Sequence, residues 1–150
     1  MKKILIGGII SILIGILVGK IIFFNKDYLI KNKEEDIYYF LQEGVYYDNN
    51  ILENSLINIR HKIFERKDEK IHVYVGITKN LEVAEKLINI YSKKDISTTI
   101  KEKSISNLEF KNNVEQFDLL IKKSNDIDEI LTIEEVVLAN YEEIIKNNEN

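Results

Sequence analysis

The chain has 150 residues, enough for one modest domain with accessory segments. Hydrophobic residues make up 45% and charged residues 31%, which is ordinary for a folded protein, and the net charge of -4 disfavours nucleic-acid binding. The chain has no cysteine, which excludes disulfide bonds, thiolate chemistry and lipoprotein attachment.

The first predicted element is an apolar run over residues 4–24, ILIGGIISILIGILVGKIIFF, which only Lys20 interrupts. At ~1.5 Å per residue, a helix of this length spans about 31 Å, close to the hydrocarbon thickness of a bilayer. The alternative is a cleavable signal peptide, which needs an Ala-x-Ala-like site. The first alanine of the chain is Ala84. We therefore expect an uncleaved transmembrane anchor over residues 1–25.

The basic residues around the run give a weak preference for its orientation. Lys2 and Lys3 precede it, and Lys20 and Lys26 lie at its other end, so the positive-inside rule slightly favours a cytoplasmic N-terminus. We expect a single-pass protein of the cell membrane with an extracytoplasmic C-terminal domain, joined by a charged linker over residues 26–36, KDYLIKNKEED.

Small residues recur every four positions along the apolar run. Such a stripe either lets two membrane helices self-associate or reflects the general abundance of glycine in these helices. It comprises Gly7, Ser11, Gly15 and Gly19.

The body of the chain begins near Ile37, and its pattern predicts the order β-α-β-β-α-β. Periodicity and turn residues predict a strand over 37–46, a helix over 48–59, a strand over 61–66, a tight turn over 67–70, a strand over 71–77, a helix capped by Asn80, and a strand over 96–103. The inner face of the second helix should comprise Val83, Ala84, Leu87 and Ile88. This order predicts an α+β, ferredoxin-like fold with a four-stranded sheet and two helices on one face.

Residues 104–150 predict two amphipathic helices in an αα-hairpin. Ser106 and Glu109 form a capping box for the first, and Asp126 and Glu129 open the second. The apolar stripes are Phe110, Val114, Phe117 and Ile121, then Ile127, Ile130, Leu131, Val137, Leu138, Tyr141, Ile144 and Ile145. The segment carries four basic and eleven acidic residues, a net charge of -7. Its stripes either pack on this domain or mediate self-association or binding of another envelope protein.

Two half-motifs, YYFLQEGVY and VYVGITKNLEVAEKL, carry a resemblance to a known family. With the repeated strand–glycine–helix order, residues 37–103 resemble the SPOR domain, the sporulation-related repeat that binds septal peptidoglycan. The chain departs from the pattern at YYDNNILEN, where Leu52 stands at a position at which alanine is common. The resemblance implies binding of glycan strands stripped of stem peptides at a division or sporulation septum.

Strand alternation assigns candidate glycan contacts to the sheet face away from the helices. If Val73, Val75 and Ile77 point toward the helices, aromatic and amide groups suited to sugars point outward. Glycines would let the ligand approach the backbone. The candidates are Phe40, Gln42, His72, Tyr74, Gly44 and Gly76. Each could instead be an ordinary sheet residue, and a register slip of one residue would invert the assignment.

No pattern indicates catalysis. His61 and His72 lack companion ligands at metal spacing, and the chain has no phosphate-binding loop or Ser/His/Asp signature. We therefore expect a non-catalytic protein without metal or cofactor.

Two functions remain: a glycan-binding module, or an envelope scaffold that binds a protein partner through the acidic helices. An open outer face favours the first, and a tail that covers this face favours the second.

Overall fold

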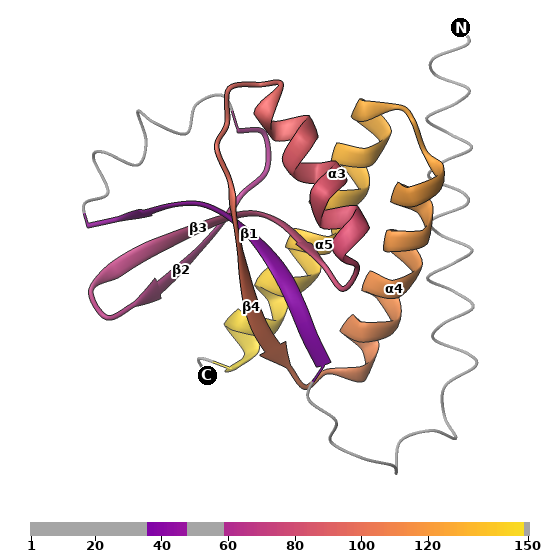
Figure 1. Cartoon of the computed structure of the whole chain (residues 1–150). Coiled ribbons are helices and arrows are strands. Elements are labelled where there is room, and N and C mark those ends of the chain that lie inside the picture. Colours follow the sequence, from indigo (N-terminus) through magenta and orange to yellow (C-terminus); the bar gives the residue numbers. More distant parts are fainter. Residues whose placement is uncertain (1–35, 48–58, 149–150) are drawn as a thin grey trace, which may run out of the picture. The chain divides into compact units, whose positions relative to one another are not determined.

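The computed structural model describes residues 36–47 and 59–148 (Figure 1). The chain divides into two compact units, residues 1–34 and 35–150, and all described residues belong to the second. The predicted anchor, the linker up to residue 35 and nearly all of the helix predicted over 48–59 lie outside the described residues. Within the described part, no helix has the length and apolar character needed to cross a bilayer.

A four-stranded antiparallel sheet and three helices make up the described fold, which confirms the α+β class. The strands are β1 (Asp36–Tyr46), β2 (Ile63–Lys67), β3 (Lys70–Thr78) and β4 (Thr99–Ile105). Their spatial order is β2-β3-β1-β4, with every neighbouring pair antiparallel. This arrangement is compatible with a ferredoxin-like fold, in which the first and third strands are central.

A two-residue turn joins β2 to β3, as the sequence predicts. Asp68 and Glu69 have φ angles of 50° and 61°. Positive φ at both central residues is typical of the type I′ turn, whose twist matches that of a hairpin. The pairing of Lys67 with Lys70 closes the ladder directly beside the turn.

The register between β1 and β3 is irregular near Gln42, which pairs with Tyr74. On one side Leu41 pairs with Gly76, so that Val75 is an extra residue on β3. On the other side Gly44 pairs with Val73. Each strand therefore carries a bulge of one residue, which interrupts the regular alternation on which the predicted face was based.

Helix α3 (Leu81–Ser92) begins at the predicted cap. The Asn80 side chain accepts hydrogen bonds from the amides of Glu82 and Val83, at 3.0 and 3.3 Å. The helix contacts β1 and β3 with an inner face that agrees with the predicted one, except that Ile88 is only half-buried. Its buried residues are Val83, Ala84, Leu87, Ile90 and Tyr91.

Helices α4 (Leu108–Lys123) and α5 (Ile127–Asn148) form the predicted αα-hairpin. Their cap differs from the prediction: Asn107, not Ser106, caps α4 by accepting the Phe110 amide at 2.9 Å. Both helices contact β3, and α4 also contacts α3. The prediction that the stripes pack on this domain is confirmed, although Ile127 is 40% exposed. The stripe residues that are buried are Phe110, Val114, Phe117, Ile121, Ile130, Val137, Leu138 and Tyr141.

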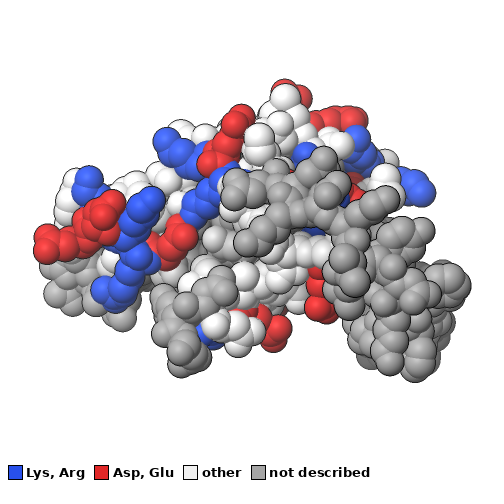
Figure 2. Space-filling model, turned by 90° about the horizontal axis from the view of Figure 1, so that it is seen from below, with Lys and Arg blue, Asp and Glu red and all other residues white. Residues whose placement is uncertain are grey.

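One continuous hydrophobic core joins the sheet to all three helices. All β3 residues from 73 to 78 are buried, including Tyr74 and Gly76, which were predicted to face outward. Seen from below, the surface carries Lys and Arg side chains interspersed with Asp and Glu (Figure 2). Mixed charge of this kind keeps a surface solvated without a strong field of one sign.

Candidate functional site

An aromatic cluster of Phe40, Tyr74 and Tyr141 lies where α5 packs on the sheet. The Phe40 ring centroid is 5.2 Å from that of Tyr74 and 5.0 Å from that of Tyr141, both in edge-to-face geometry. Their exposed fractions are 0%, 2% and 7%. The predicted open face is therefore wrong at this point, because Tyr141 packs on Phe40 and both aromatic residues assigned to sugar binding are buried.

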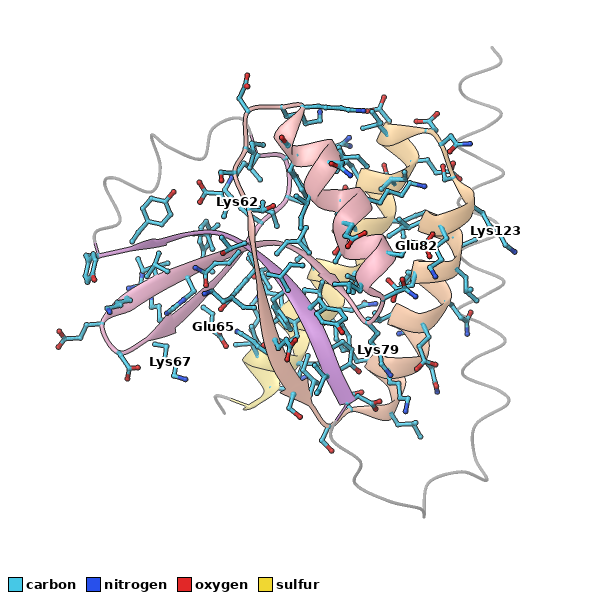
Figure 3. The ribbon with its side chains drawn as sticks, viewed as in Figure 1. Lys62, Glu65, Lys67, Lys79, Glu82 and Lys123 are labelled. Carbon is cyan, nitrogen blue, oxygen red and sulfur yellow. The ribbon has the colours of Figure 1, made fainter. Side chains whose placement is uncertain are left out.

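A lysine from β4 covers the same rings. The Lys103 ammonium lies 4.7 Å from the Phe40 centroid and 4.1 Å from the Tyr74 centroid, within the range of a cation–π contact. It also pairs with Glu65 of β2, labelled in Figure 3. Burial lowers the pKa of Lys103, although the neighbouring Glu65 carboxylate opposes this shift. Burial and Glu65 together raise the pKa of the Tyr74 hydroxyl.

Gln42 and His72 extend the cluster toward the β2–β3 hairpin. The His72 ring stacks on Tyr74, with a centroid distance of 6.3 Å and an interplanar angle of 10°. The His72 Nδ1 lies 3.4 Å from the Gln42 Oε1. The structure thus brings four predicted residues together, but Gln42 is buried and only His72 retains substantial exposure.

The chain's own side chains occupy the space beside both candidate glycines. A Cβ on Gly44 would lie 2.8 Å from the Tyr46 ring, whose hydroxyl donates to the Glu43 carboxylate at 2.8 Å. A Cβ on Gly76 would lie 3.5 Å from the Glu134 Oε1. The backbone that Gly76 was expected to offer to a ligand is thus buried, whereas Gly44 is half-buried.

Glu134 of α5 is a buried carboxyl group at the edge of β3. Strand β2 pairs with β3 only as far as Tyr74, so the Ile77 amide lies beyond the end of β2. The Glu134 Oε1 accepts this amide at 2.5 Å, and the Tyr91 hydroxyl donates to the Val75 carbonyl at 2.7 Å. Side chains from α5 and α3 thereby satisfy backbone groups that a longer β2 would have paired. Burial raises the pKa of Glu134 to about 8.

Asp118 of α4 is a second buried carboxyl group, and it joins this helix to the end of β3. Its Oδ1 accepts from the Thr78 hydroxyl at 2.6 Å and its Oδ2 accepts from the Lys79 amide at 3.0 Å. Burial raises the pKa of Asp118 to about 6, against the opposing effect of these hydrogen bonds. Lys79, labelled in Figure 3, pairs in turn with Asp36 at 2.8 Å and with Glu115 at 2.7 Å.

Sequence reasoning missed both carboxyl groups, although the helical period contains the signal. Asp118 lies four residues after Val114, and Glu134 lies four residues after Ile130. Residues at this spacing share a helix face, so both acids fall within the apolar stripes. An acidic residue inside such a stripe indicates a buried carboxyl group with a specific partner.

Chemically, the two carboxyl groups act as acceptors for backbone and hydroxyl donors. Across the described residues, no group of three or more His, Cys, Asp or Glu side chains could hold a metal ion.

The comparisons with known proteins yield no match among family models, curated proteins or solved structures. The SPOR resemblance therefore stays a prediction that rests on the two half-motifs.

Proposed function

We propose that the protein is a membrane-anchored, non-catalytic scaffold of the cell envelope that binds a protein partner through the outer surface of the α4–α5 hairpin. The observation that carries this proposal is the position of Tyr141. Its ring packs on Phe40, which is fully buried, and the neighbouring Tyr74 is only 2% exposed. These are the two aromatic residues that a glycan would have to contact. The sheet face predicted to bind a ligand is thus buried within the protein. The outer side of α4 and α5 is exposed instead.

The finer fold assignment belongs to the same proposal. We take the sheet and α3 to be a SPOR-like domain of ferredoxin-like topology, to which the hairpin has been added. The strand order β2-β3-β1-β4 supports this assignment, as do the antiparallel pairings. In this interpretation, the hairpin replaced the ligand on the open face of the ancestral sheet.

The charge of the hairpin favours a partner with a basic surface. Its apolar stripes are buried, so the outward side chains include Glu115, Asp128, Glu142 and Glu143. Leu119, four residues after Glu115 on α4, is 57% exposed and adds an apolar contact to the outer surface of the hairpin. Complementary charge accelerates encounter and excludes wrong partners, while a buried apolar residue at the centre supplies affinity.

Site-specific photo-cross-linking in the native membrane tests this proposal. A photoreactive residue at position 119 or 143 of the full chain should give one discrete cross-linked product. The same residue at Lys101, exposed on β4, is the matched control and should give none. With the photoreactive residue at position 119, the paired change Glu142→Lys and Glu143→Lys should abolish the product. A product that forms equally from position 101, or that survives the charge reversal, would contradict hairpin binding.

Glycan recognition is a second candidate, which the contact between Gln42 and His72 favours. His72 stays partly exposed at the rim of the covered face, where its ring and the Gln42 amide could meet a sugar. Full-chain protein in detergent micelles can be co-sedimented with sacculi before and after amidase treatment. Pelleting that rises with amidase treatment and falls in Gln42→Ala would support this function. Absence of pelleting from both preparations would exclude it.

A further inference from the structure

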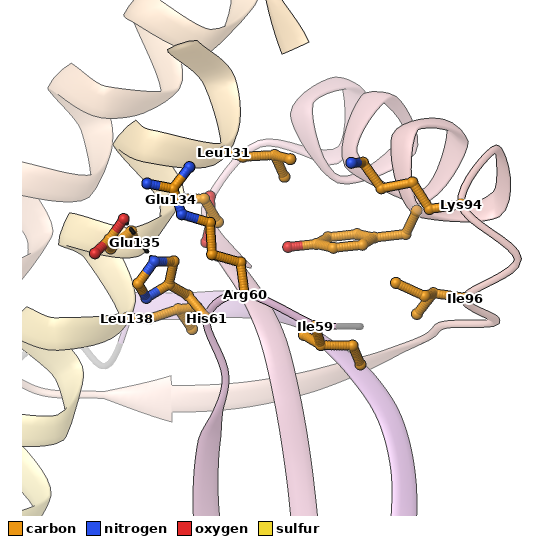
Figure 4. A pocket seen from close by; sticks show the side chains of 10 residues that line it. Ile59, Arg60, His61, Lys94, Ile96, Leu131, Glu134, Glu135 and Leu138 are labelled. Carbon is orange, nitrogen blue, oxygen red and sulfur yellow. Dashed lines mark ion pairs between the residues drawn. The ribbon is translucent and has the colours of Figure 1, made fainter. Parts of the chain in front are cut away.

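A small pocket lies between α3, α5 and the segment that leads into β2 (Figure 4). Its volume is ≈ 40 Å³. Because one water-sized probe occupies roughly 10–15 Å³, the space accommodates about three heavy atoms and their immediate contacts. Ile59, Ile96, Leu131 and Leu138 give the pocket apolar walls. It is separate from the aromatic cluster and plays no part in the proposed scaffold function.

Among the described residues that line the pocket, one buried oxygen has no hydrogen-bond partner. The Glu134 side chain is 1% exposed and lines the pocket, and its Oε1 is held by the Ile77 amide. Within the described part of the chain, its Oε2 is buried and has no hydrogen-bond partner. A buried polar atom of this kind costs free energy unless something occupies the adjacent space and bonds to it. The pocket supplies that space.

The charges at the mouth select the sign of the occupant. Arg60 and Lys94 line the pocket from the two sides in Figure 4, and both are exposed and have no ion-pair partner in the described chain. The Glu135 carboxylate, in contrast, is held by the His61 Nε2 at 2.7 Å. Burial raises the pKa of Glu134 to about 8, which keeps this group uncharged at neutral pH and able to donate a hydrogen bond. The lining is therefore positive overall and favours an anion over a metal cation.

We propose that this pocket binds a carboxylate on a short aliphatic chain. Arg60 and Lys94 supply its counter-charge, and the Glu134 carboxyl group donates to one of its oxygens from inside. The three heavy atoms of the carboxylate group suit the enclosed space, and the attached chain extends toward the open side of the pocket. The planar guanidinium of Arg60 matches a carboxylate in bidentate geometry. The apolar walls accept the attached alkyl group, which an inorganic anion lacks.

The test is an NMR titration of the full ¹⁵N-labelled chain in detergent micelles. Sodium butyrate is the probe, and sodium chloride at equal ionic strength is the reference. Because the Ile77 amide bonds to Glu134, its resonance should shift in a saturable manner with butyrate and stay unchanged with chloride. Arg60→Gln should weaken the affinity by about tenfold or more, as expected for loss of a charge-assisted hydrogen bond. Arg66→Gln on β2 is the matched control outside the pocket and should bind as wild type does.

Two further titrations identify the kind of molecule that carries the carboxylate and test the role of Glu134. A tripeptide that ends in valine, compared with its C-terminal amide, distinguishes a chain terminus from a free acid, and selective binding of either acid supports the site. Glu134→Gln keeps an acceptor for Ile77 and an N–H donor, so it should retain binding. The proposal is overturned if folded wild-type protein shows no saturable shift at Ile77. Equal responses to butyrate and chloride, or an unchanged affinity in Arg60→Gln, would overturn it as well.

Discussion

At Glu134 a carboxyl group is buried, and the described residues offer it one hydrogen bond, from the Ile77 amide, to compensate for its lost hydration. Its pKa in the folded state is raised from 4.5 to about 8. The folded state therefore binds the proton more tightly than the unfolded state does. The resulting stability is fully present below about pH 4.5 and is lost as the pH rises through about 8. The pKa of Asp118 is raised from 3.8 to about 6, so its contribution to stability is likewise lost as the pH rises through about 6.

Glu134→Gln should remove the decrease in stability between pH 6 and pH 8. Glutamine resembles the protonated acid and still accepts the Ile77 amide, so the variant should match wild type near pH 5. At pH 8 the variant should have the higher melting temperature. Thermal unfolding of the full chain in detergent micelles, followed by circular dichroism across this range, measures the effect. Parallel pH profiles for the two proteins would show that Glu134 does not titrate in this way.

Tyr141 stabilises the aromatic cluster by packing rather than through its hydroxyl. Tyr141→Ala should lower the free energy of unfolding by about 3 kcal/mol, because it leaves a cavity over Phe40. Tyr141→Phe keeps the ring and should cost about 1 kcal/mol or less. Urea unfolding of both variants provides the comparison. A small effect of the alanine variant would mean that α5 contributes little to covering the sheet.

At the scale of the elements, two adjacent residues, Ser106 and Asn107, are candidates for the N-cap of α4. Asn107 accepts the Phe110 amide, so Asn107→Ala should cost about 1 kcal/mol of stability. Ser106→Ala removes the residue that the capping-box pattern favoured and should have almost no effect. Chemical denaturation of the two variants side by side decides between them. The reverse ranking would restore the capping box and contradict the observed helix start.

The β2–β3 turn contains one residue, Glu69, that is poorly suited to its geometry. Asp68 and Glu69 both have positive φ, which asparagine and glycine adopt more easily. The double change Asp68→Asn and Glu69→Gly should therefore stabilise the fold by about 1 kcal/mol. The melting temperature of this variant, compared with wild type, measures the gain. A loss of stability would indicate a different turn.

The elements that the sequence predicts best are those with a local cause. Asn80 caps α3 through its own side chain, and the stripe of α4 follows from helical spacing alone. The register of β1 against β3 could not be predicted, since the bulges at Glu43 and Val75 depend on contacts between strands. The site was misjudged for a similar reason. Alternation places Phe40 and Tyr74 near each other but does not reveal that Tyr141, far along the chain, packs on them.

For the whole molecule, the account depends on whether the hairpin covers the sheet. A sheet with helices on one face offers the other face to a ligand. In this chain, α5 places Tyr141 on that face, and Lys103 and Glu65 complete the cover. The acidic outer surface of the hairpin is then the surface to which a protein partner can bind. The same helix supplies Glu134 to the edge of β3 and to the pocket beside it.

The measurement that tests this claim most directly is a set of nuclear Overhauser contacts between aromatic rings in the full chain. The account predicts cross-peaks from the Phe40 ring to the rings of both Tyr74 and Tyr141, whose centroids lie at 5.2 and 5.0 Å. The first contact lies within the sheet and serves as an internal control. A Phe40–Tyr74 cross-peak without a Phe40–Tyr141 cross-peak would contradict the account, because the sheet would be formed and its face would be open.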